Sequence, residues 1–344
     1  MSYPYYTGEP IDRPNQPVEL PPSRLSVQTD PKYYLPDKGL VDAVNVALLL
    51  GQPLLLTGKP GTGKTQLAYS LAYQLGLGEP LTFETKSTSQ ARDLFYVYDA
   101  LGRFHAAQAA QLGDKMDDRI KSVDYITYNA LGKAIVLTNS PEKMEKYLPL
   151  DFDKNYESRR SVVLIDEIDK APRDFPNDIL NEVENLYFRI SELGNVAIKT
   201  AVNMQPILIL TSNSEKPLPE AFLRRCIYYD IPFPDSARLV EIVEARLRTY
   251  AESSSEQNYG SDFVSDALDL FFRLQDGGLR KKPSTAELLD WLMVLRDLYK
   301  DADNPLTAHP DSVSRTLNSL VKMQEDQKTA QRISEQWSDK KRKI

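Results

Sequence analysis

Cysteine and histidine are nearly absent from this sequence of 344 residues. It has one cysteine, Cys226, and two histidines, His105 and His309. A single cysteine excludes a disulfide within the chain, and so few thiol and imidazole ligands argue against a structural zinc site.

Long apolar runs and an amino-terminal signal are also missing. No run of about 18 apolar residues occurs, which argues against a membrane-spanning helix. The opening segment, MSYPYYTGEP, has neither the basic patch nor the apolar stretch of a signal peptide. We therefore expect a cytoplasmic protein with no membrane contact.

Positively charged residues are also fewer than negatively charged ones, with 42 Lys and Arg against 49 Asp and Glu. The formal net charge is −7 and the isoelectric point is about 5.2. This balance argues against a broad nucleic-acid-binding surface, and so against direct binding of nucleic acid. The one basic cluster, Lys340–Lys343, lies at the carboxyl end. We interpret it as a frayed, solvated tail.

What the sequence does contain falls into three regions. Prolines recur through residues 1–36, so this region is predicted to be an extended arm rather than a helix or a strand. The arm is either a disordered tail or a strap along a neighbouring molecule. The tail is the simpler interpretation, and Tyr3, Tyr5 and Tyr6 keep the strap as the alternative, because aromatic side chains are enriched at interfaces.

Residues 37–232 carry short apolar runs between helical patterns. The runs lack polar alternation, which is typical of parallel strands covered by helices on both faces. Helices are predicted at Leu40–Leu50, which ends at Gly51, and at Thr65–Leu75 and Phe175–Leu186. We therefore predict a three-layer α/β domain with strands at Leu54–Thr57, Pro80–Thr85, Val162–Ile165, Ile207–Thr211 and Cys226–Ile231.

Residues 233–344 show no further strand pattern. Ser284 is a candidate N-cap, and Glu287, three residues later, would complete a capping box. We predict a small all-helical domain that ends in the basic tail. Its amphipathic helices would lie at Asp235–Tyr250, Ser261–Leu274, Ser284–Tyr299 and Asp311–Met323.

A glycine-rich segment between a predicted strand and a predicted helix matches the pattern G-x-x-x-x-G-K-[ST] of a phosphate-binding loop. Its glycines let backbone N–H groups point at phosphate oxygens, and the helix adds the positive end of its dipole. Lys64 would contact the β- and γ-phosphates, and the Thr65 hydroxyl would ligate Mg²⁺. The alternative is a glycine-rich turn with an exposed lysine. The predicted loop residues are Gly58, Lys59, Pro60, Gly61, Thr62, Gly63, Lys64 and Thr65.

Two carboxylates follow the apolar run Val162–Ile165. Such a strand delivers Asp166 to the carboxyl edge of the sheet, where ligands of open α/β folds bind. Asp166 would hold Mg²⁺, and Glu167 would polarise the attacking water as general base. The alternative is an ordinary pair of charges at a strand end. We interpret the nearby Asp169, Lys170 and Arg173 as structural or intersubunit residues without a catalytic role.

The segments GKPGTGKT and VVLIDEIDKAP together resemble AAA+ ATPases and, within them, the MoxR-like group, over about residues 37–300. The resemblance implies a P-loop NTPase core followed by a helical lid, with ATP as substrate and Mg²⁺ as cofactor. It also implies that Asn213 lies between the loop and the acidic pair and orients the water. Arg225, or alternatively Arg224, would be an arginine finger that reaches the adjacent subunit's γ-phosphate. For either arginine, an ion pair within its own subunit is the alternative.

Two segments are similar to hairpins inserted in MoxR-like proteins. Asp93–Phe104 would be a hairpin with turn residues Asp99 and Gly102, and its aromatic side chains would project toward a ring's pore or top face. A buried aromatic helix is the alternative. Tyr187–Thr200 would be a second hairpin, with its turn beginning at Gly194.

One match to the group is poor. Where MoxR-like lids carry an arginine, the second sensor, this sequence has Thr285. Arg280, Lys281 or Lys282 would have to reach the γ-phosphate from the preceding turn. The coupling of nucleotide state to lid position is therefore open.

The resemblance implies a homo-oligomeric ring, expected to be hexameric, that hydrolyses ATP to remodel or activate a partner protein, as a chaperone does. A separate von Willebrand A-domain protein often works with this group. One alternative is an AAA+ motor or nucleotide switch in a nucleic-acid-targeting defence system. A lesser one is a P-loop kinase acting on a small molecule.

Overall fold

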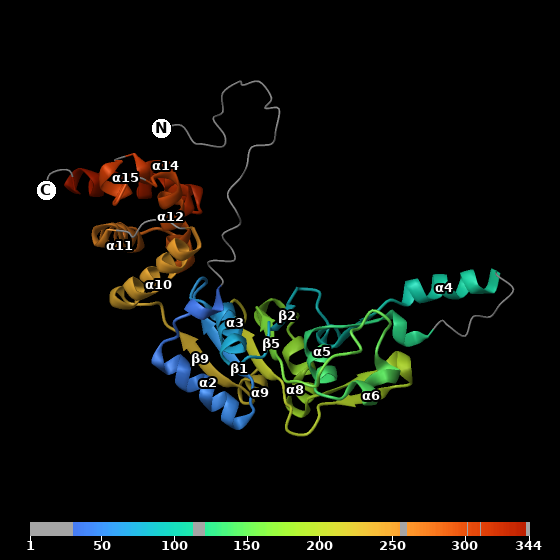
Figure 1. Ribbon diagram of the computed structural model, residues 1–344. Helices are drawn as coiled ribbons and strands as arrows, with labels where there is room; N and C mark the ends of the chain where they lie inside the picture. The colour runs from blue at the N-terminus through green and yellow to red at the C-terminus, as the bar shows by residue number, and fades with distance from the viewer. Residues whose placement is uncertain (1–29, 113–120, 255–259, 301, 310, 342–344) are drawn as a thin grey trace. The chain divides into compact units, whose positions relative to one another are not determined.

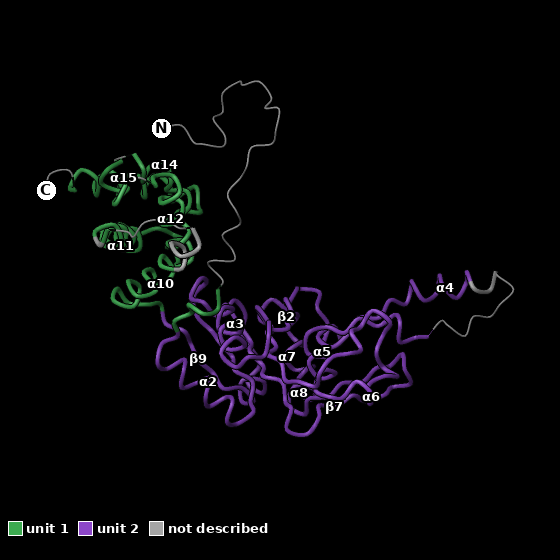
Figure 2. The backbone as a smooth tube through the Cα atoms, in the orientation of Figure 1, with its two compact units in different colours: residues 1–35, 233–344 green, residues 36–232 purple. Residues whose placement is uncertain are grey.

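The computed structural model describes residues 30–112, 121–254, 260–300, 302–309 and 311–341. Most of the predicted arm, residues 1–29, lies outside the described residues. The chain divides into two compact units, one of residues 36–232 and one of residues 1–35 with 233–344 (Figure 2).

The unit of residues 36–232 is built on a five-stranded parallel sheet (Figure 1). The order of the strands across the sheet is β2-β5-β8-β1-β9. All five predicted strands are confirmed, with bounds that differ by one residue at most at either end. They are β1 (Leu54–Gly58), β2 (Leu81–Glu84), β5 (Val162–Asp166), β8 (Ile207–Thr211) and β9 (Ile227–Ile231).

Helices cover both faces of this sheet. Leu55, Val163 and Leu210 lie in the apolar core on one face. Their chain neighbours point to the other face and are buried too, as period-two geometry requires of a sheet covered twice. The three-layer α/β prediction is confirmed. The main covering helices are α2 (Lys38–Leu50) against β9 and β1, α3 (Lys64–Gln74) against β1, β5 and β8, and α5 (Ala130–Leu137) against β2 and β5.

Helix ends follow the chemistry of their residues. The Asp37 side chain accepts a hydrogen bond from the Leu40 N–H at 2.9 Å and so caps α2, which ends at Gly51 in the left-handed conformation. The single helix predicted at Phe175–Leu186 is wrong, because it is interrupted at Ile179. The segment instead forms two short helices, α7 (Phe175–Asp178) and α8 (Leu180–Asn185). Two further short helices of this unit are α6 (Pro141–Met144), before β5, and α9 (Glu220–Leu223), after β8.

The predicted hairpin at Asp93–Phe104 is wrong, and so is the alternative of a buried aromatic helix. Asp99 accepts a hydrogen bond from the Gly102 N–H at 2.8 Å and starts a helix instead of a turn. That helix leads away from the sheet (Figure 1). The strand before it pairs with a distant segment, giving a two-stranded ribbon. The elements are β3 (Tyr96–Tyr98), α4 (Ala100–Leu112) and β4 (Ile126–Tyr128).

The second predicted hairpin is confirmed. It consists of β6 (Tyr187–Ile190) and β7 (Val196–Lys199), with Gly194 in the left-handed conformation between them. Phe95 and Tyr96, expected to project outward, are buried against this hairpin. The Phe95 ring stacks on Phe188 with centroids 5.4 Å apart. The aromatic residues of the first segment therefore join the two ribbons.

The other unit contains only helices in its described part, and its core includes Trp291 and Trp337. The capping box of Ser284 and Glu287 is confirmed. None of the helices in the described ranges is long and apolar enough to cross a membrane. The helices are α10 (Ser236–Ser254), α11 (Ser261–Asp276), α12 (Thr285–Leu298), α13 (Pro305–Ala308), α14 (Ser312–Thr316) and α15 (Gln324–Lys341).

Three predictions for this unit are wrong. Asp311–Met323 is broken after α14 and continues as a 3-10 turn. The basic end is not frayed up to Lys341, because α15 includes it and its ammonium pairs with the Asp266 carboxylate. Residues 342–344 lie outside the described range. The arm is not extended at Pro31–Tyr33, where a 3-10 helix begins with a proline that needs no N–H partner.

Candidate functional site

The candidate residues gather at the carboxyl edge of the parallel sheet. Strand β8 lies between β1 and β5, so the segments that follow these three strands are neighbours. The predicted loop follows β1, the acidic pair closes β5, and Asn213 lies just beyond β8. This edge is where ligands of open parallel sheets bind.

The loop at residues 58–65 has a backbone that requires glycine. Gly58, Gly61 and Gly63 have φ angles of 134°, 78° and 87°. A Cβ atom on Gly58 would lie 2.7 Å from the Ile231 carbonyl oxygen, closer than van der Waals contact allows. Helix α3 then starts at Lys64, one residue before the predicted start, with the N–H groups of its first turn at the loop.

The Lys64 ammonium is held inside this loop. It donates to the carbonyl oxygens of Gly58 at 2.7 Å and Lys59 at 3.1 Å. Burial lowers the pKa of Lys64, and the negative charges of Asp166, Asp169 and others oppose that shift. Thr62 donates to the Lys59 carbonyl at 2.9 Å, while Pro60 and Gly61 lie exposed at the tip.

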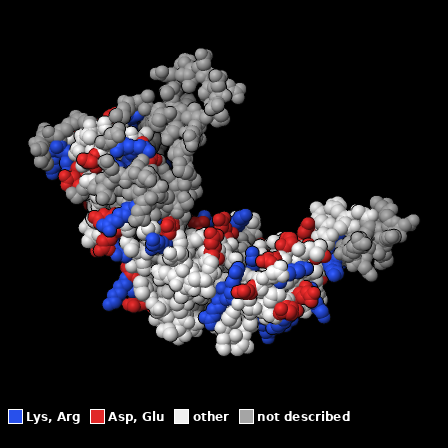
Figure 3. Space-filling view, viewed as in Figure 1, with Lys and Arg blue, Asp and Glu red and all other residues white. Residues whose placement is uncertain are grey.

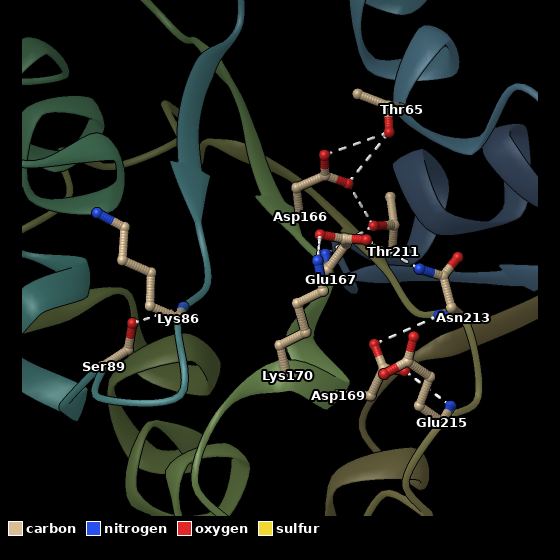
Figure 4. Close-up of polar contacts among 10 residues, drawn as sticks. All are labelled: Thr65, Lys86, Ser89, Asp166, Glu167, Asp169, Lys170, Thr211, Asn213 and Glu215. Carbon is tan, nitrogen blue, oxygen red and sulfur yellow. Dashed lines mark hydrogen bonds and ion pairs between the residues drawn. The ribbon is translucent and has the colours of Figure 1, made fainter. Parts of the chain in front are cut away.

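Three side chains, which we call the inner cluster, join the loop to the sheet: Thr65, Asp166 and Thr211. The Thr65 hydroxyl lies 3.1 and 3.3 Å from the two Asp166 carboxylate oxygens. The Thr211 hydroxyl donates to Asp166 Oδ1 at 2.5 Å and accepts from the Glu167 N–H at 2.9 Å. Asp166 is thus fixed from both sides (Figure 4).

Three further side chains form the outer cluster: Glu167, Lys170 and Asn213. Asn213 Nδ2 donates to Glu167 Oε1 at 2.9 Å, and the Lys170 ammonium forms an ion pair with Glu167 Oε2. Both carboxylate oxygens of Glu167 therefore have a partner (Figure 4). Glu167 itself has the left-handed backbone conformation, with a φ angle of 55°.

An open pocket of about 460 Å³ adjoins the outer cluster. It leaves space beside the Glu167 carboxylate for water or a small polar group. The pocket is lined by Glu84, Thr85, Lys86, Asp166, Glu167 and Lys170.

The donor set fits a magnesium ion that shares its shell with phosphate and water. Within the described ranges no group of three or more His, Cys, Asp or Glu residues could hold a metal by itself. Mg²⁺ is usually bound by one or two carboxylates, with substrate phosphates and several waters completing the octahedron. Thr65 and Asp166 match that requirement.

The two candidate arginine fingers have partners elsewhere in the same unit. Arg224 pairs with Glu220 at 2.5 Å, and its side chain is 75% exposed. Arg225 pairs with Glu184 at 2.9 Å and donates to the Ala221 carbonyl. The structure thus contains the ion pairs within one subunit that were the alternative for both arginines. Both arginines directly follow α9, and their acidic partners lie on α9 and α8.

The candidates for the second sensor belong to the helical unit. Arg280 forms an ion pair with Glu325, and the backbone N–H groups of Arg280 and Lys281 donate to Asp326. Thr285, at the position expected for an arginine, is buried at the start of α12.

Sequence reasoning missed two residues of the site. Thr211 was assigned only to its strand, although its position at the carboxyl end of β8 was a usable signal. Lys170 was interpreted as structural or intersubunit, yet its ammonium contacts the Glu167 carboxylate. The spacing of three residues in a helical turn could have indicated this contact.

Comparison with known proteins adds the following. The family model for the ATPase family associated with various cellular activities (AAA) matches residues 54–234. No curated protein matches the chain. Among solved structures, the chain is similar to RuvB of Thermotoga maritima, a Holliday junction branch migration motor, with 16% identity and a TM-score of 0.42. It is also similar to a mutant of that protein, with 17% identity and a TM-score of 0.43. Each match covers 82% of this chain and 67% of the other.

Proposed function

Because this chain belongs to the ATPase family associated with various cellular activities (AAA), we propose that it binds and hydrolyses ATP at the loop of residues 58–65. The observation that carries the proposal is that the inner cluster includes a loop residue, Thr65, and that the outer cluster directly follows the inner one along the chain. A hydroxyl and a carboxylate suited to Mg²⁺ lie beside a second carboxylate held by an amide. A binding site without hydrolysis would need only the loop.

Each residue then has a defined task. The glycine-rich backbone and Lys64 would hold the phosphates, and Thr65 and Asp166 would hold Mg²⁺. When bound, the metal neutralises charge on the phosphate oxygens. Glu167 accepts a proton from the attacking water as general base, and Asn213 orients Glu167 and that water.

The resemblance to MoxR-like proteins supports a ring of identical subunits, proposed to be a hexamer. In such a ring Arg225, or Arg224, would leave its own ion pair and neutralise charge at the neighbour's γ-phosphate. Both are exposed enough for this, with side-chain exposures of 42% and 75%. Exposed ion pairs contribute only about 0–1 kcal/mol, so the cost of breaking either pair is small.

The proposed work of the ring is to remodel or activate a partner protein in the cytoplasm, and a separate von Willebrand A-domain protein is the proposed helper. The net charge of −7 supports a protein partner over nucleic acid. So does the face shown in Figure 3, where Lys and Arg alternate with Asp and Glu over the sheet unit.

The variant Glu167→Gln tests the proposal most directly. The amide cannot accept a proton, so kcat should fall by about 10²- to 10⁴-fold. ATP binding should be unchanged, because Glu167 contacts neither the loop backbone nor Lys64. Steady-state ATPase rates and calorimetric ATP titration measure the two quantities. In the wild type, activity per subunit should rise with protein concentration as rings form.

Two results would count against the proposal. Undiminished turnover in Glu167→Gln would show that Glu167 is not the general base. Activity that comes from a monomer and does not depend on protein concentration would show that no arginine finger from a neighbouring subunit is needed. The proteins that co-purify with Glu167→Gln in ATP would identify the client. Stimulation of hydrolysis by nucleic acid, with a steep salt dependence, would instead favour the defence-system alternative.

A further inference from the structure

Asp169 lies one turn beyond the acidic pair, in the 3-10 helix Ile168–Lys170, and is only 3% exposed. Its carboxylate is directed at the loop that follows β8. Oδ1 accepts from the Asn213 N–H at 3.3 Å, and Oδ2 accepts from the Glu215 N–H at 2.9 Å (Figure 4). Both oxygens of a buried carboxylate are therefore used to hold one short piece of backbone.

That piece of backbone sets the direction of the Asn213 amide. Ser214, between the two N–H groups, has a φ angle of 60°, which non-glycine residues adopt only when their surroundings hold them. The Ser212 hydroxyl accepts from the Ser214 N–H at 2.9 Å and stabilises the same turn. Within this turn, the Asp169 carboxylate is the charged partner, and charged partners form the stronger hydrogen bonds.

The loop after β8 also donates hydrogen bonds to the end of the 3-10 helix. Lys216 donates to the carbonyl oxygens of Lys170 at 3.3 Å and Ala171 at 3.2 Å. The 3-10 helix and the loop after β8 are thus joined in both directions. A displacement of the Asp169 carboxylate would therefore move the Asn213 backbone. It would also move the Asn213 amide that donates to Glu167.

We propose that Asp169 is a positioning residue for hydrolysis: it holds the Asn213 backbone so that the Asn213 amide orients Glu167. This inference rests on the proposed function and assigns Asp169 a task that the sequence did not indicate. Asp169 touches neither Glu167 nor the phosphate loop in this scheme. It acts through Asn213, and its charge adds to those that oppose the lowered pKa of Lys64.

The variant Asp169→Asn separates positioning from general packing. It keeps the size of the side chain but replaces one accepting oxygen with an NH₂ group, which cannot accept from a backbone N–H. The kcat should fall on the order of 10-fold, because small misplacements of catalytic groups are costly. The KM for ATP should change less than about twofold, because the loop is untouched.

A double-mutant cycle makes the test specific. In an Asn213→Ala background, Asp169→Asn should lower kcat by less than about twofold, because the side chain that it positions is gone. The control is Asp174→Asn, the same chemical change at an exposed aspartate on the same segment, which should leave kcat unchanged. An equal loss in both backgrounds, or a raised KM with unchanged kcat, would overturn the proposal.

Amide hydrogen exchange provides a readout that does not depend on turnover. Exchange at Asn213 and Glu215 should accelerate by about 10-fold or more in Asp169→Asn, while exchange within β8 stays slow. If the wild type hydrolyses no ATP, the proposed function fails, and this measurement still decides whether Asp169 holds the loop. Unchanged exchange at both amides would show that it does not.

Discussion

The inner cluster of Thr65, Asp166 and Thr211 and the outer cluster of Glu167, Lys170 and Asn213 lie at one edge of one sheet, yet different kinds of contact hold them. In the inner cluster, both hydroxyls contact the Asp166 carboxylate, and all three residues belong to regular elements. In the outer cluster, an exposed ammonium and a loop amide hold the Glu167 carboxylate.

This difference follows from how each cluster is built. Ile165 pairs with Leu210 in the sheet, so Asp166 and Thr211, one residue further, must be neighbours. The hydrogen-bonded register of the strands thus fixes the inner cluster. Glu167 instead leaves the strand in a left-handed conformation, and its partner Lys170 is 44% exposed. The inner cluster is therefore preset by the register of the sheet, whereas the exposed contact between Glu167 and Lys170 in the outer cluster is not.

The variant Asp166→Asn tests the inner cluster and should have the largest effect on the rate of ATP hydrolysis. It removes the charge that suits Mg²⁺ while keeping the side chain's size. We expect hydrolysis at fixed Mg²⁺ to fall by about 100-fold or more, since even residues that only support metal ligands contribute about 10- to 100-fold. Titration of the ATPase rate with Mg²⁺ measures the effect. An unchanged Mg²⁺ midpoint would show that Asp166 does not hold the metal.

The variant Thr211→Val should affect both clusters, because one hydroxyl serves Asp166 and the Glu167 N–H. The Glu167 N–H would lose its partner, and an unpaired buried group costs about 1–3 kcal/mol. We expect kcat to fall by about 10-fold and the melting temperature to drop. Thr211→Ser, which keeps the hydroxyl, is the matched control and should retain both. If Thr211→Val and Thr211→Ser behave alike, the hydroxyl does not couple the clusters.

Much of the sheet could be predicted from the sequence, because its three central strands, β5, β8 and β1, are mostly uninterrupted apolar runs next to a turn or a polar group. The loop was equally legible, since Gly58 and Gly63 adopt backbone conformations that side chains resist. The first ribbon was not, because β3 pairs with β4 across a long insertion, and no local pattern reports such a pairing. Helix α15 was missed because few apolar residues, chiefly Ala330 and Trp337, mark its buried side.

The candidate site divides in the same way. The residue types of the inner cluster follow from motif spacing, apart from Thr211. The contact of Glu167 with Asn213 and the partners of Asp169 depend on where two loops meet, which spacing along the chain does not determine. The expected aromatic face of the first insert failed for a related reason. Phe95 and Tyr96 found partners in the second hairpin, which lies far from them in the sequence.

The variant Lys170→Met tests the outer cluster. It should cause the smallest change in kcat, and that change should be an increase. The Lys170 ammonium pairs with Glu167 Oε2, while Asn213 Nδ2 donates to Oε1, so an attacking water competes with the ammonium for the carboxylate. Removing the ammonium should therefore raise kcat. An exposed ion pair contributes at most about 1 kcal/mol, which limits the increase to about fivefold. ATP binding should stay the same, because Lys170 lies outside the loop.

The ion pair of Glu167 and Lys170 has to be tested by substitution, because a change of pH near neutrality does not remove the charge of the Lys170 ammonium. The hydrogen bond to Glu167 raises the pKa of Lys170 above its ordinary value, so the ammonium keeps its charge until strongly alkaline pH. A group with a raised pKa loses its contribution only as pH rises through that value. Lys170→Arg retains the charge and should leave the ATPase rate within about twofold of the wild type. A lower rate in Lys170→Met would mean that Lys170 supports Glu167 instead of restraining it, and both clusters would then be preset by the fold.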